Sequence, residues 1–454
     1  MINQNEIICR TRDSLMILNA RTHEILFAAP CFATACSPTG QKIAYADLYG
    51  LRVIDTKNFS EIMRARNDGI KLLSFSHCEN YLVTWEKQIE ENPNLFVWEI
   101  STGQVFYSFI QVNYNKELWP SVVFTYDNRN LLYKNNDEIQ IYQISERNLL
   151  RSFNEIRIAN YSLSPKLPNR LAIYSVDIKG SSPSISYWIS DENLNFQLDS
   201  SSQITKPQIV TFQWNCDASR VLAICQTEID NTGRVYPGEN ALYVMTQGKS
   251  PRKINLDEGP IHDIKWSPNN DEFISIAGFF PAGINLYKGI GGKFRDLGKN
   301  NRNMIRWNPY GNLFLIGGLG NLQGYIDICE RENFNIIGRC RVPNIISCEW
   351  GPDGKMFFVG ILSPRIRNNN GYILYKYTGE ILANFEIGEL WEIQWKPENI
   401  EMEPLTPREG KIEIMGLEEE RKTKDTEKND NFIPGLGPDA KKKKKKKKKN
   451  KSNN

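Results

Sequence analysis

A short phrase, in which an alternating apolar segment ends in Trp and a Pro-containing turn follows, occurs three times between residues 261 and 360. The three copies are Trp266-Ser-Pro, Trp307-Asn-Pro and Trp350-Gly-Pro-Asp-Gly, and a second apolar segment follows each one. Proline presets φ in such a turn, and Gly or Asn tolerates the positive φ that the turn needs. Strand-turn-strand units with a period of about forty residues are typical of a β-propeller.

Weaker versions of this phrase extend over the whole body of the chain. They follow Cys36, Phe75, Phe124, Leu163, Trp214 and Trp395, which gives nine copies in all. No apolar segments follow the last copy, whereas the chain start supplies three without a copy, at residues 6–9, 15–18 and 24–27. We therefore expect the two ends to share a blade, so that residues 1–397 form an all-β, nine-bladed, WD40-like propeller without an exposed sheet edge. A merged or split blade would change the count to eight.

The composition changes after this body. Residues 397–454 contain 16 Lys and Arg against 12 Asp and Glu, a net charge of +4, which leaves −1 for the rest of a chain whose net charge is +3. Residues 401–430 are charged and poor in aromatic side chains, and nine consecutive lysines run from Lys441 to Lys449. We expect residues 398–454 to be a disordered charged tail. The lysine run is either an unselected low-complexity expansion or an electrostatic tether for RNA.

The sequence carries no positive sign of catalysis. Its three histidines, His23, His77 and His262, stand apart, and no spacing typical of metal ligands and no paired-carboxylate site is found. The glycine-rich stretch from Gly317 to Gly324 lacks the helix and the Lys-Ser/Thr pair of a phosphate-binding loop. We therefore expect no enzymatic activity, no metal and no cofactor.

Targeting signals are missing as well. No apolar run approaches about eighteen residues, so we expect no transmembrane helix. The N-terminus has no basic region followed by an apolar one, so no secretion signal is expected. The nine cysteines form no Cys-x-x-Cys pair, and such scattered thiols favour a reduced, cytoplasmic setting.

Binding residues are expected in the loops between the second and third strands of the blades, because insertions there lie on one rim of the ring. In one such loop, Arg365 and Arg367 could hold phosphates while Asn369 and Asn370 bind sugar or base edges. A plain hairpin loop is the alternative, since Asn370-Gly371 is a strong turn signal. In another loop, Phe279 and Phe280 form either a stacking platform or a cover over the rim. The candidate contacts for RNA or the ribosome are Arg302, Asn321, Arg365, Arg367, Asn369, Asn370, Lys441, Lys445 and Lys449, and those for other partners are Arg234, Phe279 and Phe280.

Several longer segments together resemble the eukaryotic translation initiation factor 2A family. They include Gly259-Pro-Ile-His-Asp-Ile-Lys-Trp, Gly278-Phe-Phe-Pro-Ala, Gly318-Leu-Gly-Asn-Leu-Gln-Gly, Pro364-Arg-Ile-Arg-Asn-Asn-Asn-Gly-Tyr and Glu389-Leu-Trp-Glu-Ile-Gln-Trp-Lys-Pro. The resemblance implies a propeller that binds the small (40S) ribosomal subunit and assists codon-dependent, GTP-independent delivery of initiator methionyl-tRNA. It also implies contact with mRNA and with other initiation factors, in the cytoplasm and away from membranes.

The family usually continues into a longer basic, helical region after the propeller, whereas this sequence stops after its lysine run. The resemblance therefore supports ribosome association more directly than tRNA delivery. The alternative is a non-enzymatic scaffold for protein partners, similar to the propeller-bearing subunit of initiation factor 3. The near-neutral body of the chain fits that alternative.

Overall fold

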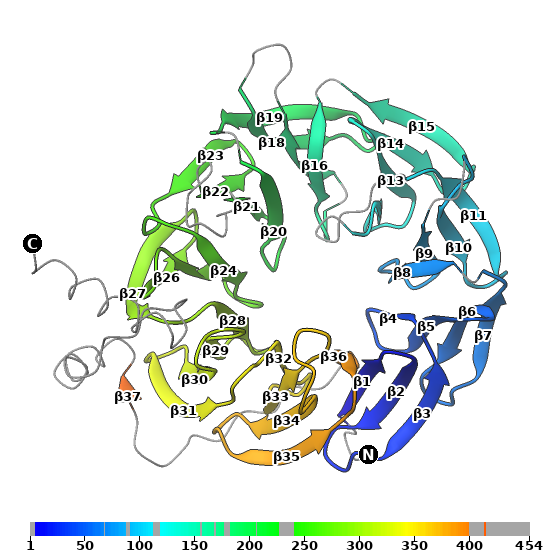
Figure 1. Cartoon of the computed structure of the whole chain (residues 1–454). Helices are drawn as coiled ribbons and strands as arrows, with labels where there is room; N and C mark the ends of the chain where they lie inside the picture. Colours follow the sequence, from blue (N-terminus) through cyan, green and yellow to red (C-terminus); the bar gives the residue numbers. More distant parts are fainter. Residues whose placement is uncertain are drawn as a thin grey trace, which may run out of the picture.

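The computed structural model describes residues 5–398, except for 68, 88–90, 112–118, 155–156, 168, 177–181, 206 and 227–239, together with a strand at 413–414. Within these residues, nine antiparallel sheets stand around a central axis, and one strand of each sheet lies innermost (Figure 1). The predicted all-β, nine-bladed propeller is therefore confirmed.

The blades are numbered in chain order, and the strands of each are given from the inside outward. Blade 1 contains β4 (Ala33–Cys36), β5 (Lys42–Asp47), β6 (Gly50–Asp55) and β7 (Glu61–Ala65). Blade 2 contains β8 (Ile70–Phe75), β9 (Tyr81–Glu86), β10 (Leu95–Glu99) and β11 (Gln104–Phe109). Blade 3 contains β12 (Val122–Phe124), β13 (Asn130–Asn135), β14 (Glu138–Gln143) and β15 (Asn148–Phe153). Blade 4 contains β16 (Ile158–Leu163), β17 (Arg170–Ser175), β18 (Ser184–Ser190) and β19 (Phe196–Gln203). Blade 5 contains β20 (Ile209–Trp214), β21 (Arg220–Gln226), β22 (Ala241–Thr246) and β23 (Lys249–Ile254). Blade 6 contains β24 (Ile261–Trp266), β25 (Glu272–Ala277), β26 (Ala282–Lys288) and β27 (Gly292–Asn300). Blade 7 contains β28 (Met304–Trp307), β29 (Leu313–Gly317), β30 (Tyr325–Glu330) and β31 (Asn335–Arg341). Blade 8 contains β32 (Ser347–Trp350), β33 (Met356–Ile361), β34 (Gly371–Lys376) and β35 (Ile381–Glu386). Blade 9 contains β36 (Leu390–Trp395), β1 (Glu6–Thr11), β2 (Ser14–Asn19) and β3 (Ile25–Pro30).

Blade 9 joins the two ends of the body, as the sequence predicted. Strand β36 pairs antiparallel with β1, and Arg10 lies opposite Glu392 in this register. The two side chains form a bidentate ion pair, with Nη2 to Oε1 at 2.7 Å and Nε to Oε2 at 2.9 Å. On the neighbouring blade, Asp353 accepts a hydrogen bond of 3.0 Å from the Asn5 side chain. Pairing of the terminal strands closes the ring and removes the sheet edges that an open array would expose.

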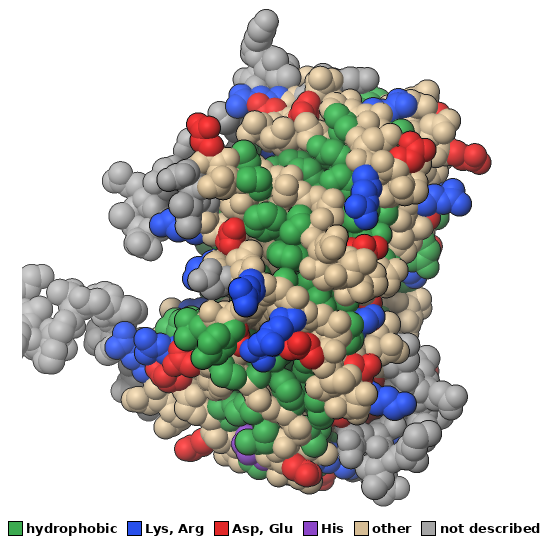
Figure 2. Space-filling model, turned by 90° about the vertical axis from the view of Figure 1, so that its right-hand side faces the viewer, with side chains coloured by type: hydrophobic (Ala, Val, Ile, Leu, Met, Phe, Trp, Pro, Cys, Tyr) green, Lys and Arg blue, Asp and Glu red, His purple; other side chains and the backbone are tan. Residues whose placement is uncertain are grey.

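The core lies between neighbouring sheets. Ile274 and Ile276 of β25, for example, belong to the same buried cluster as Ile305, Phe314 and Ile316 of the next blade. The outermost strands keep more side chains in solvent, and exposed apolar residues there include Ile62, Val105, Leu149 and Leu150. Figure 2 shows the outer wall on the right-hand side of Figure 1, where apolar side chains lie among scattered charged ones.

In several blades, the residue directly after the inner strand holds the following turn in place. In blade 7, the Asn308 side chain accepts a hydrogen bond of 3.0 Å from the Leu313 amide, and its own amide bonds to the Leu313 carbonyl. Ser37, Ser76, Thr125 and Asn215 accept equivalent hydrogen bonds in other blades. These side chains are buried. A short polar side chain that bonds the backbone a few residues ahead is a standard way to stabilise such turns.

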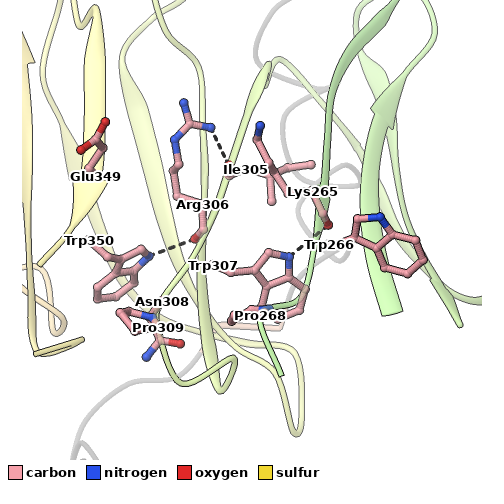
Figure 3. Close-up of a pocket in the computed structure, with 10 residues that line it drawn as sticks. All are labelled: Lys265, Trp266, Pro268, Ile305, Arg306, Trp307, Asn308, Pro309, Glu349 and Trp350. Atoms are coloured by element: carbon pink, nitrogen blue, oxygen red, sulfur yellow. Dashed lines mark hydrogen bonds between the residues drawn. The ribbon is translucent and has the colours of Figure 1, made fainter. Parts of the chain in front are cut away.

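The tryptophans that end the inner strands of blades 6 to 9 fasten each of these blades to the preceding one. Their indole Nε1 groups donate to the backbone carbonyl of the residue just before the inner-strand terminus of the preceding blade (Figure 3). The pairs are Trp266 to Gln213 (2.9 Å), Trp307 to Lys265 (3.2 Å), Trp350 to Arg306 (2.9 Å) and Trp395 to Glu349 (3.1 Å). These tryptophans also pack against buried core clusters, and hydrogen bonding adds to their packing.

One structural feature was not predicted. Residues Glu413–Ile414 form β37, which pairs antiparallel with β31 and makes blade 7 five-stranded. In the sequence, these two residues fall inside the segment that was expected to be disordered. Apart from Glu398, the rest of the predicted tail, including the lysine run, lies outside the described residues.

We predict that Trp307→Phe destabilises the protein by about 1 to 2 kcal/mol, because the Lys265 carbonyl loses its donor inside a packed interface. The matched control is Trp391→Phe, since Trp391 lies in β36 with 37% of its surface exposed; this change should cost about 0.5 kcal/mol or less. Urea unfolding followed by intrinsic fluorescence measures both. Equal destabilisation by the two substitutions would contradict the role given to the indole hydrogen bond.

We further predict that deletion of residues 1–11 opens the ring, because it removes the partner of both β36 and β2. The freed edges should lower the thermal midpoint and convert monomer into larger species. Truncation after Met415 is the control, since it removes none of the described strands. Light scattering after size exclusion gives the result, and a monomeric deletion variant with an unchanged midpoint would count against closure by β1.

Candidate functional site on the loop rim

The two ends of the ring carry different connections. Because strands run antiparallel within each blade, connections alternate between the two ends of the sheet. The loops between second and third strands, and the links from one blade to the next, therefore share one end, which we call the loop rim. The Pro-containing turns lie at the opposite end, the turn rim. The predicted grouping of the long loops on one side follows from this topology.

The loop between β29 and β30 is fixed by the two links that join blade 7 to blades 6 and 8. The Asn303 side chain brackets Leu319, accepting from its amide at 2.7 Å and donating to its carbonyl at 3.3 Å. On the other side, the Gly320 amide donates to the Ile345 carbonyl at 2.8 Å. Gly324 has a φ of 73°, and a Cβ there would lie 1.8 Å from the Val342 carbonyl oxygen. The glycines therefore permit the tight rim turn that the sequence suggested, and Asn321 remains exposed within it.

The loop between β33 and β34 separates its polar residues into two groups. Asn370 is buried; its side chain donates to the Ile366 carbonyl at 2.8 Å, and its carbonyl accepts from the Ile387 amide at 2.9 Å. Asn370 therefore stabilises the loop itself. Arg365, Arg367 and Asn369 are exposed.

These two loops meet at a cleft of about 380 Å³. Arg365 lines it from blade 8, Asn321 from blade 7 and Phe280 from blade 6. A Cβ on Gly320, which has a φ of 68°, would lie 3.1 Å from Arg365 Nη2, so a larger residue would crowd the guanidinium. Three candidate residues far apart in sequence thus line one cleft.

The aromatic pair of the β25–β26 loop is partly packed and partly exposed. Phe280 stacks on His262, with ring centroids 4.3 Å apart and planes inclined by 18°. His262 Nε2 is 2.9 Å from the Gly278 carbonyl oxygen, to which it can donate. Phe280 nevertheless remains 44% exposed and Phe279 remains 60% exposed. Phe280 therefore covers part of its own blade and still presents ring surface to solvent.

Arg302 has a structural environment. It is 6% exposed, and its Nη2 and Nε contact Asp327 Oδ2 at 2.7 and 3.1 Å. Arg339 pairs with the other oxygen of the same carboxylate. A buried guanidinium needs such a partner, because an unpaired buried charge is costly. This interaction and its burial leave Arg302 poorly placed to contact a phosphate.

The remaining candidates have no described position. Arg234, Lys441, Lys445 and Lys449 lie outside the described residues, and so does most of the loop from 227 to 240. Conversely, sequence reasoning passed over His262, Asn303 and Ile345, which shape the cleft. Their positions in the sequence could have indicated this, because all three lie at or just before the start of an inner strand, and inner strands start at the loop rim.

A second pocket, of about 580 Å³, lies between the inner strands of blades 6, 7 and 8 (Figure 3). Arg306 is held there by Asp263 Oδ2 at 3.2 Å and by the carbonyls of Ile305 and Cys348 at 2.7 and 3.2 Å. Burial raises the pKa of the Glu349 carboxyl, and Arg306 opposes that rise. Basic and acidic groups balance in this pocket, and its indole groups bond to neighbouring blades. We assign it a structural role.

The described part of the chain contains no group of three His, Cys, Asp or Glu residues that could hold a metal ion. In the same part, no helix has the length and apolar character needed to cross a membrane.

Comparison with known proteins identifies the family. Residues 203–393 match the family model described as eukaryotic translation initiation factor eIF2A. Proteins named eukaryotic translation initiation factor 2A are similar over 81% of this chain in Caenorhabditis elegans and in Dictyostelium discoideum, at 30% identity in both cases. The chain spans 67% of the first relative and 61% of the second.

A solved structure described as a eukaryotic initiation factor superposes with a TM-score of 0.78 at 26% identity, covering 88% of this chain and all of the other. A subunit of eukaryotic translation initiation factor 3 from Xenopus laevis is more distant, at 21% identity over 80% of the chain. The chain belongs to the eukaryotic translation initiation factor 2A family, whose members are non-enzymatic translation initiation factors.

Proposed function

We propose that the loop rim docks on the small ribosomal subunit, and that the docked protein assists delivery of initiator methionyl-tRNA to a start codon without GTP. One observation carries the docking step: Arg365 and Arg367 are both exposed on the loop rim, and neither forms an ion pair with another described residue. An arginine without an acidic partner can bind a phosphate through two parallel hydrogen bonds. Membership of an initiation factor family supports RNA of the ribosome as the source of those phosphates.

Independence from GTP is supported by the geometry of the glycine-rich loop. A nucleotide-binding loop presents its amides at the N-terminus of a helix. Here the loop leads into strand β30, and the Gly320 amide is used by the Ile345 carbonyl. The codon-dependent step would then rely on the ribosome and the mRNA.

The lysine run has a supporting part in this proposal. Nine adjacent cations would bind RNA phosphates without sequence preference and with strong salt dependence. The body, at a net charge of −1, supplies little long-range attraction. The run would therefore raise the encounter rate with ribosomes in the cytoplasm, and the loop rim would orient the bound protein.

A second candidate function is a scaffold for protein partners. Leu48 and Tyr49, at the tip between β5 and β6, are 71% and 72% exposed, and Phe279 on the same rim is 60% exposed. Exposed apolar and aromatic groups of this kind are typical anchors of protein interfaces. Other initiation factors would be the partners in that case.

We predict that the double substitution Arg365→Glu and Arg367→Glu weakens binding to purified small subunits by about tenfold at ~0.1 M salt, because two phosphate contacts become repulsive. The slope of log K against log salt should become shallower by about 2. The control is Arg21→Glu with Arg129→Glu, which makes the same charge change on the exposed turn rim. Sucrose-gradient sedimentation after crosslinking, over a series of salt concentrations, measures each variant.

The same sedimentation measurements distinguish docking on the ribosome from the scaffold function. If the protein docks on the ribosome, deletion of Lys441 to Lys449 should further lower its affinity for small subunits and make that affinity depend less on salt. If neither the arginine variant nor the lysine deletion changes sedimentation, the scaffold model is favoured. A protein that stays at the top of the gradient at low salt, even with crosslinking, would refute docking.

The delivery step makes its own prediction. Labelled initiator methionyl-tRNA should be retained on small subunits when the protein and an AUG-containing mRNA are both present, and GTP should not change the amount retained. Filter binding measures retention, and an mRNA without AUG is the control. Equal retention with and without the protein, or with and without AUG, would contradict assisted delivery.

A further inference from the structure

The cleft between blades 6, 7 and 8 has walls that are fixed before any ligand arrives. Its middle wall is the loop at Leu319 and Gly320, which Asn303 holds from one side and the Ile345 carbonyl holds from the other. A site whose walls are already in place loses little conformational entropy on binding. At about 380 Å³, the cleft lies near the lower end of the range for ligand pockets. It suits one small, planar group rather than a helix or a folded domain.

One wall of the cleft offers an aromatic surface. Phe280 rests against His262 at 4.3 Å, and the His262 ring is itself held at the Gly278 carbonyl. The ring of Phe280 is therefore supported from behind, while 44% of the residue stays exposed and lines the cleft. A supported, solvent-facing ring is the platform on which an unpaired base stacks.

The opposite wall offers a positive charge. The Arg365 guanidinium lies over Gly320, where a Cβ would come within 3.1 Å of Nη2. No described carboxylate pairs with it. Asn321, exposed in the same cleft, adds an amide that can both donate and accept hydrogen bonds. The amide of Asn303 is already used by Leu319.

We propose that this cleft is a subsite for one unstacked nucleotide of single-stranded RNA, with its base on Phe280, its phosphate at Arg365 and its polar edge near Asn321. The inference rests on the proposed docking of the loop rim and specifies the chemistry of one contact. An aromatic face together with a free guanidinium is the combination that proteins use for splayed-out bases. An acidic peptide would satisfy the arginine, but it would have less use for the stacking surface.

The test is photocrosslinking of the full-length protein to a hexauridylate that carries one 5-iodouridine, followed by digestion and mass spectrometry. At about 0.3 M salt, binding by the lysine run is strongly reduced, and any remaining tail crosslinks are identified by their own peptides. We expect a crosslinked peptide that contains Phe279 and Phe280. Phe280→Leu should lower its yield by about tenfold, because a stacked base is lost. Arg365→Gln should lower the crosslinking yield several-fold and make the slope of log yield against log salt shallower by about one unit.

Phe294→Leu is the matched aromatic control, because Phe294 is 52% exposed but lies on the outermost strand β27 of the same blade. It should leave the yield unchanged, as should Arg129→Gln on the turn rim. Thermal unfolding checks that every variant is folded. Crosslinks confined to the tail would overturn the subsite, and so would a yield indifferent to Phe280→Leu. Stronger competition by an acidic, tyrosine-containing peptide than by unlabelled RNA would also overturn it.

Sedimentation with small subunits separates this inference from the proposed function. If the protein sediments with the subunit but the cleft does not crosslink, the subsite is wrong and docking stands. If the cleft crosslinks RNA but the protein does not sediment with the subunit, docking is wrong and the subsite stands.

Discussion

In the second half of the ring, the indole Nε1 of an inner-strand tryptophan donates to a backbone carbonyl of the preceding blade, and four successive blades repeat this contact. The bond has two effects. It satisfies a carbonyl that faces the neighbouring blade, and it fixes the distance between two sheets whose contact is otherwise formed by apolar side chains and by polar pairs such as Arg306 with Asp263. The corresponding strand-end residues of blades 1 to 4 are Cys36, Phe75, Phe124 and Leu163, none of which can donate in this way. Other contacts replace the bond there, such as Thr39 with Glu79 at 2.6 Å and His77 with the Tyr126 carbonyl at 2.9 Å.

The contacts that fix this spacing lie at the turn rim. The loops at the other end of the propeller can therefore vary in length and composition. Turn-rim residues are tied to their own blade and to the next one, so their backbone has little freedom. Among the described residues the loop rim shows no such repeated contact, and its loops differ in length and composition from blade to blade. The cleft forms where two of these loops meet at the tightly linked blades 6 to 8. No tryptophan of the series lines it, and its own loop is held by Asn303 and the Ile345 carbonyl.

The features that sequence could predict were those with a local cause. Trp, a small polar residue and Pro in succession determine a strand end and a turn, and their recurrence was enough to predict nine blades and closure by the two ends. Contacts between distant segments were not predictable from such patterns. Arg302 resembled a phosphate contact because Asp327, which neutralises it, lies in another strand. Asn370 resembled a recognition residue, yet its side chain binds the Ile366 carbonyl. Arg365 and Asn321 were named separately, and only the curvature of the ring brings them to one cleft.

The charge distribution is compatible with the proposed binding of RNA by a nearly neutral propeller. A strongly basic surface would attract phosphates over a Debye length of about 8 to 10 Å, but it would do so in any orientation. Here several positive charges of the body are paired, as at Arg10, Arg302 and Arg306, and the net charge of the body is only −1. In the proposed site, the exposed Arg365 beside the supported ring of Phe280 would act mainly at short range, where direction matters. If the lysine run supplies the long-range attraction, the two tasks of capture and orientation fall to separate parts of the chain, and the loop rim can be selective because it does not also have to be strongly charged.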